Sequence, residues 1–348
     1  MKNHAPKVTL LIPGLLEPFS GIDPSLFPDL PALTKLLSKG CTRQTENNNY
    51  ETTLCDLFNI YPDNNNELPI AQLTWLTDSG SPSSTALLRA DPVHLRADQA
   101  ELRLFPANQL SITESEAKQL INLLNEHYHG DGIEFIAPTP TRWYVQLKQQ
   151  PSLTTHPLSC VAGNDIRHFL PNGKDAAYWK GLFNEIQMLL HDHAVNLSRR
   201  DNQQPAINSL WFWGGGPIEK IARPSNQLVM SNDVLAESLA KFTGSRFVYF
   251  DTDIEVACDE AAADKSAILI AHNDFLDSIA CADFNSWSQM LEKSEQTLFK
   301  PLLSALKKGK IVAVTVLPCN RMLYQVRRNQ LLHFWKPVKS LKSFAGKF

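Results

Sequence analysis

The segment from Ala176 to Gly216 constrains the fold most, because its hydrophobic pattern changes from helix to strand and then stops at three glycines. From Trp179 to Leu190, apolar residues recur three or four positions apart, as on the buried face of an amphipathic helix. A polar stretch follows, and Leu210 to Trp213 is an apolar run of strand length. Ligands usually bind at the carboxyl ends of strands in open α/β sheets, so this order predicts the position of a site.

Polar side chains suited to an anion gather in this segment. Guanidinium and amide groups in a cleft make bidentate contacts with carboxylate or phosphate, and the backbone N–H groups of a glycine turn can bind an anion. The expected anion pocket consists of His193, Asn196, Arg199, Asn208, Trp213, Gly214, Gly215 and Gly216, with Arg89 and Arg142 as further candidates. No GK[ST] follows the glycines, so they do not form a P-loop, and a tight turn and a phosphate nest both remain open. The two further arginines alternatively lie on solvated strand faces.

The rest of the chain alternates strand and helix patterns. Val8 to Ile12 is a continuous apolar run bounded by Pro13 and Gly14, typical of a buried strand in a parallel sheet. Strand patterns at 246–250, 268–271 and 311–316 alternate with helical patterns at 232–241 and 286–308. This alternation predicts an α/β fold with a mostly parallel sheet flanked by helices.

Residues 85–170 have a different character. Two alternating strands, 86–98 and 100–105, precede a helix at 113–127, and two more strands follow at 133–137 and 142–147. A block of this size can form a small α+β domain. We therefore expect a core made of residues 1–84 and 171–335, with residues 85–170 as an inserted α+β domain.

Charge is distributed unevenly along the chain. No Asp or Glu follows Glu295, whereas eleven Lys and Arg do, so the last 53 residues carry +11 and the preceding ones −14. Residues 336–348 have four lysines and no core periodicity, which predicts a basic tail that contacts an acidic protein or another anionic surface. The alternative places Arg327 to Trp335 in an edge strand of the α/β body, with its cations exposed.

Composition indicates the cellular compartment in which the protein is expected. The chain is 43% hydrophobic, and its six cysteines are scattered without a CxxC pair. Free thiols indicate a reducing compartment. No apolar run has the length or flanks of a membrane span or signal peptide, so we expect a cytoplasmic protein.

Three motifs carry a resemblance to a known family: RADPVHLRADQAELRL from Arg89, TPTRWYVQL from Thr139, and HAVNLSRRDNQQPAINSLWFWGGG from His193. They resemble the archaeal-type cofactor-independent phosphoglycerate mutases of the alkaline phosphatase superfamily. They are more similar still to proteobacterial proteins described as phosphoglycerate-mutase-related or regulatory. VTLLIPG and IVAVTV stand where that superfamily has its first and last strands. The resemblance implies an alkaline-phosphatase-like sheet.

The sequence departs from this family at its metal ligands. The family holds two divalent metals with Asp and His at strand ends, and these activate a Ser or Thr nucleophile. The first ligand is an Asp directly before a Gly, but Pro13 precedes Gly14 here. The last strand should end in an Asp-His pair, but Leu317 and Pro318 stand there, and the nucleophile segment is at best Thr52-Thr53. We therefore expect no catalytic residue, metal or cofactor.

Two functions remain open. The first is a catalytically degenerate, regulatory protein that binds a partner or a phosphorylated or carboxylate small molecule. The alternative is a metal-dependent phosphoryl-transfer enzyme, a phosphoglycerate mutase or phosphatase. Its metal site would be rebuilt from Asp251, Asp253, His272 and Asp274, although Asp after a strand also commonly forms turns.

Overall fold

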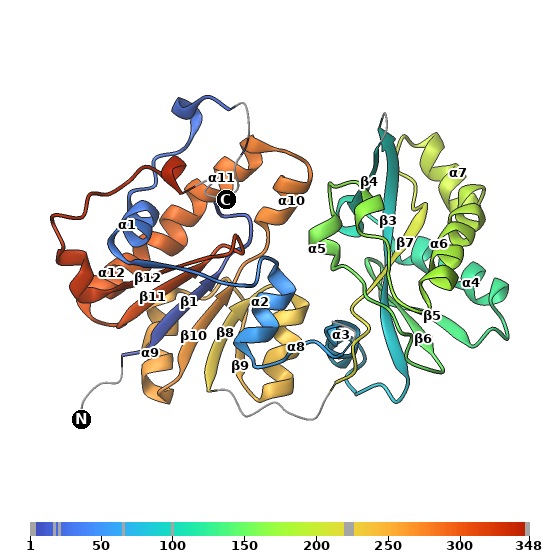
Figure 1. Ribbon diagram of the computed structural model, residues 1–348, viewed down its shortest axis with the longest axis horizontal. Coiled ribbons are helices and arrows are strands. Elements are labelled where there is room, and N and C mark those ends of the chain that lie inside the picture. The colour runs from blue at the N-terminus through green and yellow to red at the C-terminus, as the bar shows by residue number, and fades with distance from the viewer. Residues whose placement is uncertain are drawn as a thin grey trace. The chain divides into compact units, whose positions relative to one another are not determined.

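The structure, a computed structural model, describes residues 5–16, 19, 22–64, 67–98, 101–218 and 226–344. The chain forms two compact units, one of residues 1–59 and 222–348 and the other of residues 60–221 (Figure 1). We call them the parallel-sheet unit and the antiparallel-sheet unit. The expected insertion, residues 85–170, lies within the second. That unit also includes flanking segments, because a helix before the insertion and a strand after it pack against the same sheet.

The parallel-sheet unit is built on a sheet whose central strands are apolar and buried. Its strands are β1 (Lys7–Leu11), β2 (Cys41–Gln44), β8 (Gln227–Ser231), β9 (Arg246–Val248), β10 (Ala267–Ala271), β11 (Ala313–Leu317) and β12 (Met322–Arg327). Among the described residues, they follow the order β2-β12-β11-β1-β10-β8-β9. The run from β11 to β9 is parallel, and β12 and β2 are antiparallel additions at one edge. The predicted mostly parallel sheet is confirmed.

Helices cover both faces of this sheet. They are α1 (Pro31–Lys39), α2 (Tyr50–Leu57), α8 (Val234–Thr243), α9 (Ile254–Asp264), α10 (Phe275–Ala280), α11 (Phe284–Ser294) and α12 (Lys300–Lys308). Apolar residues of α1, α9, α11 and α12 form one core cluster with alternate residues of the strands. Helices α2 and α8 lie over the opposite face, on the viewer's side in Figure 1. The predicted flanking of the sheet by helices is therefore confirmed.

The long helix predicted over 286–308 contains a π-helical turn, Glu295–Phe299, between α11 and α12. Glu295 is buried, and its two carboxylate oxygens accept the backbone N–H groups of Ala32 at 2.7 Å and Leu33 at 3.1 Å. These donors begin α1, whose N-cap residue makes no side-chain cap. The last acidic residue of the sequence thus caps a helix from a distance, where the helix dipole favours negative charge.

The antiparallel-sheet unit contains the predicted strand, strand, helix, strand, strand order. Its strands are β3 (Ala86–Asp98), β4 (Glu101–Pro106), β5 (Ile133–Thr139), β6 (Arg142–Leu147) and β7 (Ser209–Trp213), and its helices are α3 (Ile70–Ser79), α4 (Glu114–His127), α5 (Leu158–Val161), α6 (Ala176–His191) and α7 (Ala194–Asp201). Residues of α4, α6 and α7 share one core cluster with the sheet, and α3 packs with Leu87 and Tyr144 in another.

Strand β7, which leads into the three glycines, belongs to this antiparallel sheet. It pairs with β3 from Arg89 opposite Trp213 to Val93 opposite Ser209. The expectation that it ends at the carboxyl edge of an open α/β sheet is wrong. The reason is the length of β3, whose thirteen residues pair with β6, β7 and β4 in turn along the strand.

The C-terminal segment also differs from the sequence predictions. The strand β12 ends at Arg327 and lies between β11 and β2, so the predicted edge strand over 327–335 is wrong. Residues 336–344 are not devoid of core contacts, because Leu341 and Phe344 are buried and the Phe344 ring lies 5.7 Å from that of Tyr324. Residues 345–348 lie outside the described residues.

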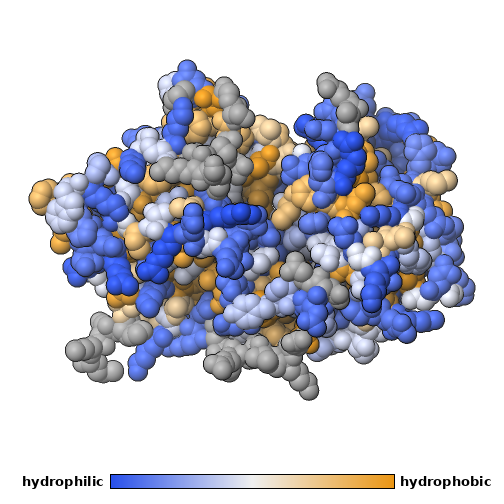
Figure 2. Space-filling model, in the orientation of Figure 1, coloured by the Kyte–Doolittle hydropathy of each residue, from blue (hydrophilic) through white to orange (hydrophobic). Residues whose placement is uncertain are grey.

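None of the helices in the part of the chain that the structure describes is both long and apolar enough to cross a bilayer. The face drawn in Figure 2 is largely hydrophilic, with smaller hydrophobic areas between the hydrophilic residues.

Candidate functional site

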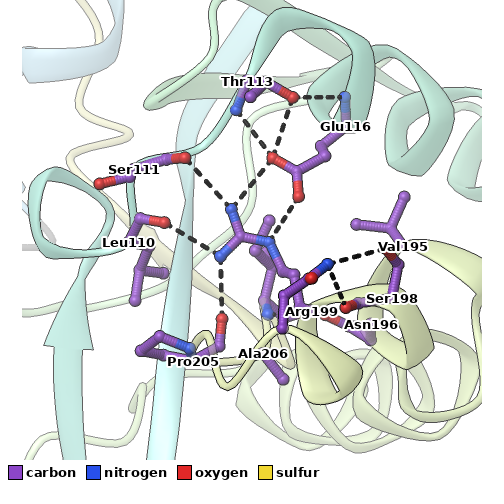
Figure 3. Close-up of polar contacts among 12 residues, drawn as sticks. Leu110, Ser111, Thr113, Glu116, Val195, Asn196, Ser198, Arg199, Pro205 and Ala206 are labelled. Carbon is purple, nitrogen blue, oxygen red and sulfur yellow. Dashed lines mark hydrogen bonds and ion pairs between the residues drawn. The ribbon is translucent and has the colours of Figure 1, made fainter.

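Arg199, the central candidate for anion binding, is a buried structural residue (Figure 3). It is 1% exposed, and its Nε and Nη2 donate to the two oxygens of Glu116 at 2.7 and 3.0 Å. Its Nη1 donates to the carbonyls of Leu110 at 3.0 Å and Pro205 at 2.9 Å, and Nη2 also approaches the carbonyl of Ser111. All five guanidinium donors are therefore used within the protein. Arg199 joins α7 to the start of α4.

The neighbouring polar candidates have similar internal partners. The Asn196 side chain donates to the carbonyls of Leu190 and Ile207 and accepts the Ile207 N–H at 2.8 Å. Asn208 exchanges two hydrogen bonds with the backbone of Leu95, at 2.7 and 2.9 Å. His193 is the N-cap of α7. These side chains satisfy backbone groups that neither a sheet nor a helix pairs.

The backbone N–H groups of the three glycines all have acceptors within the protein. The N–H of Gly215 donates to a carboxylate oxygen of Glu67 at 3.2 Å, and the N–H of Gly214 donates to the Thr155 hydroxyl at 3.1 Å. The N–H of Gly216 donates to the carbonyl of Leu68. A Cβ at Gly216 would lie 2.4 Å from the Glu67 carbonyl, so only glycine allows this packing. Of the three N–H groups that the phosphate-nest prediction invokes, that of Gly215 binds the Glu67 carboxylate.

Arg89, Arg142 and Trp213 form ion pairs and ring contacts. The Arg89 guanidinium pairs with Asp91 at 2.5 Å and lies 5.3 Å from the ring centres of both Tyr144 and Trp213. The Trp213 indole donates to the same Asp91 at 2.7 Å. Arg142 pairs with Asp78. The structure binds the ten candidate residues to internal partners at several places in the unit, and Arg89 and Trp213 share Asp91.

The environment of Glu67 predicts how the stability of the protein depends on pH. Burial raises the pKa of its carboxyl above the usual value, although hydrogen bonds from Thr155 and Gly215 oppose the shift. A raised pKa means that the contribution of Glu67 to stability is fully present below the unfolded pKa, about 4.3, and is lost as pH rises through the folded pKa. We expect Glu67→Gln to become more stable relative to the wild type as pH rises from about 4 to 7. Paired urea titrations across that range measure it, and a constant difference between the two proteins would contradict the assignment.

The carboxyl edge of the parallel sheet contains the four candidate metal ligands, but they do not converge. Asp251 is exposed, and Asp253 caps α9 by accepting the Glu255 N–H at 2.6 Å. Only His272 and Asp274 approach each other, at 3.8 Å. Within the described ranges, no group of three or more His, Cys, Asp or Glu side chains is arranged to hold a metal ion.

His272 is packed as an aromatic side chain at this edge. Its ring stacks on Phe250 at 4.7 Å and meets Phe275 edge-on at 5.5 Å. Burial lowers the pKa of this imidazole, although Asp274 opposes the shift. A neutral, stacked His272 fits the core of the unit better than a ligand set.

The turn after β1, where the family has its first metal ligand, is apolar and closed. Pro13 and Gly14 are buried beside Leu15 and Leu16. Gly14 has φ +77°, and a Cβ there would lie 2.2 Å from the Ile279 side chain. The residues present therefore do not fit two divalent cations, since an apolar enclosure lacks the oxygen and nitrogen donors that such ions need.

A polar cluster that the sequence did not reveal lies at the same edge. Asp233, just after β8, accepts the Tyr50 hydroxyl at 3.0 Å and the Asn273 amide at 3.3 Å, and it caps α8. Burial raises the pKa of the Tyr50 hydroxyl well above its usual value, and the negative charge of Asp233 adds to this shift. The only sequence signal is the N-cap pattern at Asp233. The fold thus assembles a Tyr50–Asp233–Asn273 cluster at the carboxyl edge.

The possible nucleophile segment is next to this cluster on α2. The Thr53 hydroxyl donates to the Asn49 carbonyl at 2.6 Å within the first turn of the helix. Thr53 is also buried. Its proton is thus used by the backbone, as is common for threonine in helices.

Comparisons with known proteins support the resemblance found in the sequence. No protein-family model matches the chain. A 2,3-bisphosphoglycerate-independent phosphoglycerate mutase from Methanosarcina barkeri is 24% identical over 159 residues, which are 41% of this chain and 40% of that protein. Another from Methanosarcina mazei is 29% identical over 111 residues, 31% of this chain and 28% of that protein. The aligned segments therefore span less than half of each relative.

A solved structure shares the fold. The PH0037 protein from Pyrococcus horikoshii superposes with a TM-score of 0.51 at 14% identity, over 93% of this chain and 87% of that chain. That likeness concerns the architecture alone. The sequence matches identify this chain as a distant relative of the 2,3-bisphosphoglycerate-independent, or cofactor-independent, phosphoglycerate mutases.

Proposed function

We propose that this protein is a phosphoglycerate-mutase-like regulatory protein, which binds a ligand or partner and has lost the two-metal phosphoryl-transfer site. The observation that carries the proposal is the closed turn at Pro13 and Gly14. In two-metal phosphoryl transfer, the cations activate the attacking group and neutralise developing charge. A proline offers no side-chain donor for such a cation, and its apolar neighbours offer none either.

The other positions around this edge support the same conclusion. His272 is packed between two phenylalanine rings, and Asp253 is used as a helix cap. A charge-bearing metal site would have to displace these contacts. None of these side chains therefore supports the alternative, a metal-dependent mutase or phosphatase.

The ligand that we propose is a phosphorylated or carboxylate small molecule, because the relatives are named for phosphoglycerate. The ten candidates in the antiparallel-sheet unit already have internal partners. We therefore place the binding site at the carboxyl edge of the parallel sheet, where α/β proteins usually bind ligands.

The purified protein is expected to take up Mn²⁺, Mg²⁺ and Zn²⁺ only substoichiometrically and not to interconvert 2- and 3-phosphoglycerate. Elemental analysis after dialysis against each metal, with an enolase-coupled assay, measures both. His272→Ala serves as a control that should leave metal content unchanged. One or two bound equivalents, or turnover that a chelator abolishes, would contradict the proposal and favour the metal-dependent enzyme.

A further inference from the structure

The segment from Leu332 to Val338 displays large apolar side chains on the surface of the parallel-sheet unit. Leu332 is 78% exposed, Phe334 88%, Trp335 66% and Val338 48%. The rings are also in contact with one another: His333 stacks on Trp335 at 4.6 Å, and Phe334 meets Trp335 edge-on at 5.1 Å. Single exposed apolar residues are ordinary, but a run of four within seven positions marks an interaction surface. We call it the 332–338 segment.

Hydrogen bonds hold the backbone of this segment against the C-terminal end of α1. The ammonium of Lys39, a buried side chain, donates to the carbonyls of His333 and Lys336, the first at 2.8 Å. In return, Lys336 donates to the carbonyl of Gly40. The N–H of Lys339 donates to the Ser38 hydroxyl at 2.9 Å. The apolar side chains are thus presented outward by a fixed backbone.

The chain that forms and flanks this segment carries only positive charge, although Asp23 lies near enough to Lys342 to interact with it electrostatically. No acidic residue occurs in the sequence after Glu295, and Arg327, Arg328, Lys336, Lys339 and Lys342 flank or interrupt the segment. Lys339 and Lys342 are exposed. Aromatic and aliphatic side chains beside lysines are the composition that binds an anionic bilayer, because the cations attract the headgroups while the apolar groups enter the interface.

Other occupants fit these observations less well. A second copy of the same face would bring its cations against identical cations, and like charges at an interface oppose association. A single-stranded nucleic acid would stack its bases on aromatic rings. Leu332 and Val338 offer no ring, and Trp335 already has one neighbour stacked on it.

We propose that the 332–338 segment docks this protein peripherally on an anionic lipid surface, with Leu332, Phe334, Trp335 and Val338 entering the interface and Lys339 and Lys342 contacting the headgroups. This attachment is separate from the ligand site proposed above.

Vesicle cosedimentation tests the proposal. The full-length protein is expected to bind vesicles of phosphatidylcholine with phosphatidylglycerol at low salt, to bind pure phosphatidylcholine weakly, and to be released at high salt. The double variant Phe334→Ser, Trp335→Ser should lower the partition coefficient at least about tenfold, because two interfacial anchors are lost. Each of Lys339→Gln and Lys342→Gln should lower it about fivefold.

A matched control and a spectroscopic measurement identify the surface. Met188 on α6 is 78% exposed, and Met188→Ser should leave vesicle binding unchanged. Brominated lipids should quench tryptophan fluorescence in the wild type and much less in Trp335→Phe, although that variant still binds. Melting temperatures should be unaffected in every variant, since these side chains are exposed.

Four outcomes would overturn the proposal. They are equal binding to neutral and anionic vesicles, no binding to either, binding of an oligonucleotide in preference to vesicles, or self-association that Phe334→Ser abolishes. The proposed regulatory function is judged by metal content and turnover, so either proposal can fail without the other.

Discussion

Replacing Arg199 with alanine is expected to destabilise the antiparallel-sheet unit by about 1–3 kcal/mol, the cost of leaving buried acceptors without a donor. Arg199 donates to both oxygens of Glu116 and to the carbonyls of Leu110 and Pro205 (Figure 3). The alanine variant leaves these acceptors without their donor inside the protein. Such unsatisfied groups pay the full cost of desolvation.

Urea unfolding followed by tryptophan fluorescence measures this effect. The control is Arg200→Ala, one residue further along α7, where the side chain is exposed and the change should stay within about 0.5 kcal/mol. A double-mutant cycle with Glu116→Gln should show a coupling of about 0.5–3 kcal/mol between the two positions. Equal stability of the Arg199 and Arg200 variants would disprove the structural role and reopen the anion-binding interpretation.

Truncation of the chain after Trp335 is expected to destabilise the parallel-sheet unit strongly. The deletion removes Leu341 and Phe344, which are buried in the core cluster. Each such side chain contributes about 1.5–3 kcal/mol by burial. A domain is stable by only about 5–15 kcal/mol in total, so a truncated protein should melt at a much lower temperature or fail to fold.

The matched control for this deletion ends the chain after Phe344, which retains every described contact of the segment. It should melt near the wild type. The point variant Leu341→Ala, Phe344→Ala should reproduce most of the loss without removing Lys336 or Lys339. Circular dichroism melts of the three proteins measure it, and an unchanged melting temperature after truncation at Trp335 would mean that residues 336–344 are a dispensable tail.

Much of the architecture follows from local sequence pattern. Strand β3 begins and ends where the alternation of apolar and polar residues predicts, and α4 has Thr113 as its N-cap with a capping box to Glu116. The continuous apolar run of β1 is buried between parallel neighbours. These features are predictable because periodicity and capping involve residues that are a few positions apart.

The candidate site depends on contacts between distant residues, which sequence pattern does not contain. The segment from His193 to Gly216 has the polar residues and glycines of a ligand site, but its groups are bound within the protein. A buried arginine that donates to backbone carbonyls and an arginine that binds phosphate have the same side chain. They differ only in whether the folded chain supplies acceptors for the guanidinium group.

The sequence by itself determined elements such as β1, β3 and α4, the α/β class and the absence of a carboxylate before Gly14, because each depends on residue identity or local spacing. Only the tertiary structure decided which polar groups pair. Arg199 and Glu116 are 83 residues apart, Glu67 and Gly215 are 148 apart, and Tyr50 and Asp233 are 183 apart. Buried polar groups must find partners wherever the packed chain brings them. A local sequence pattern does not contain these contacts between distant residues. The same residues therefore resemble a ligand site in the sequence and bind other parts of the chain in the fold.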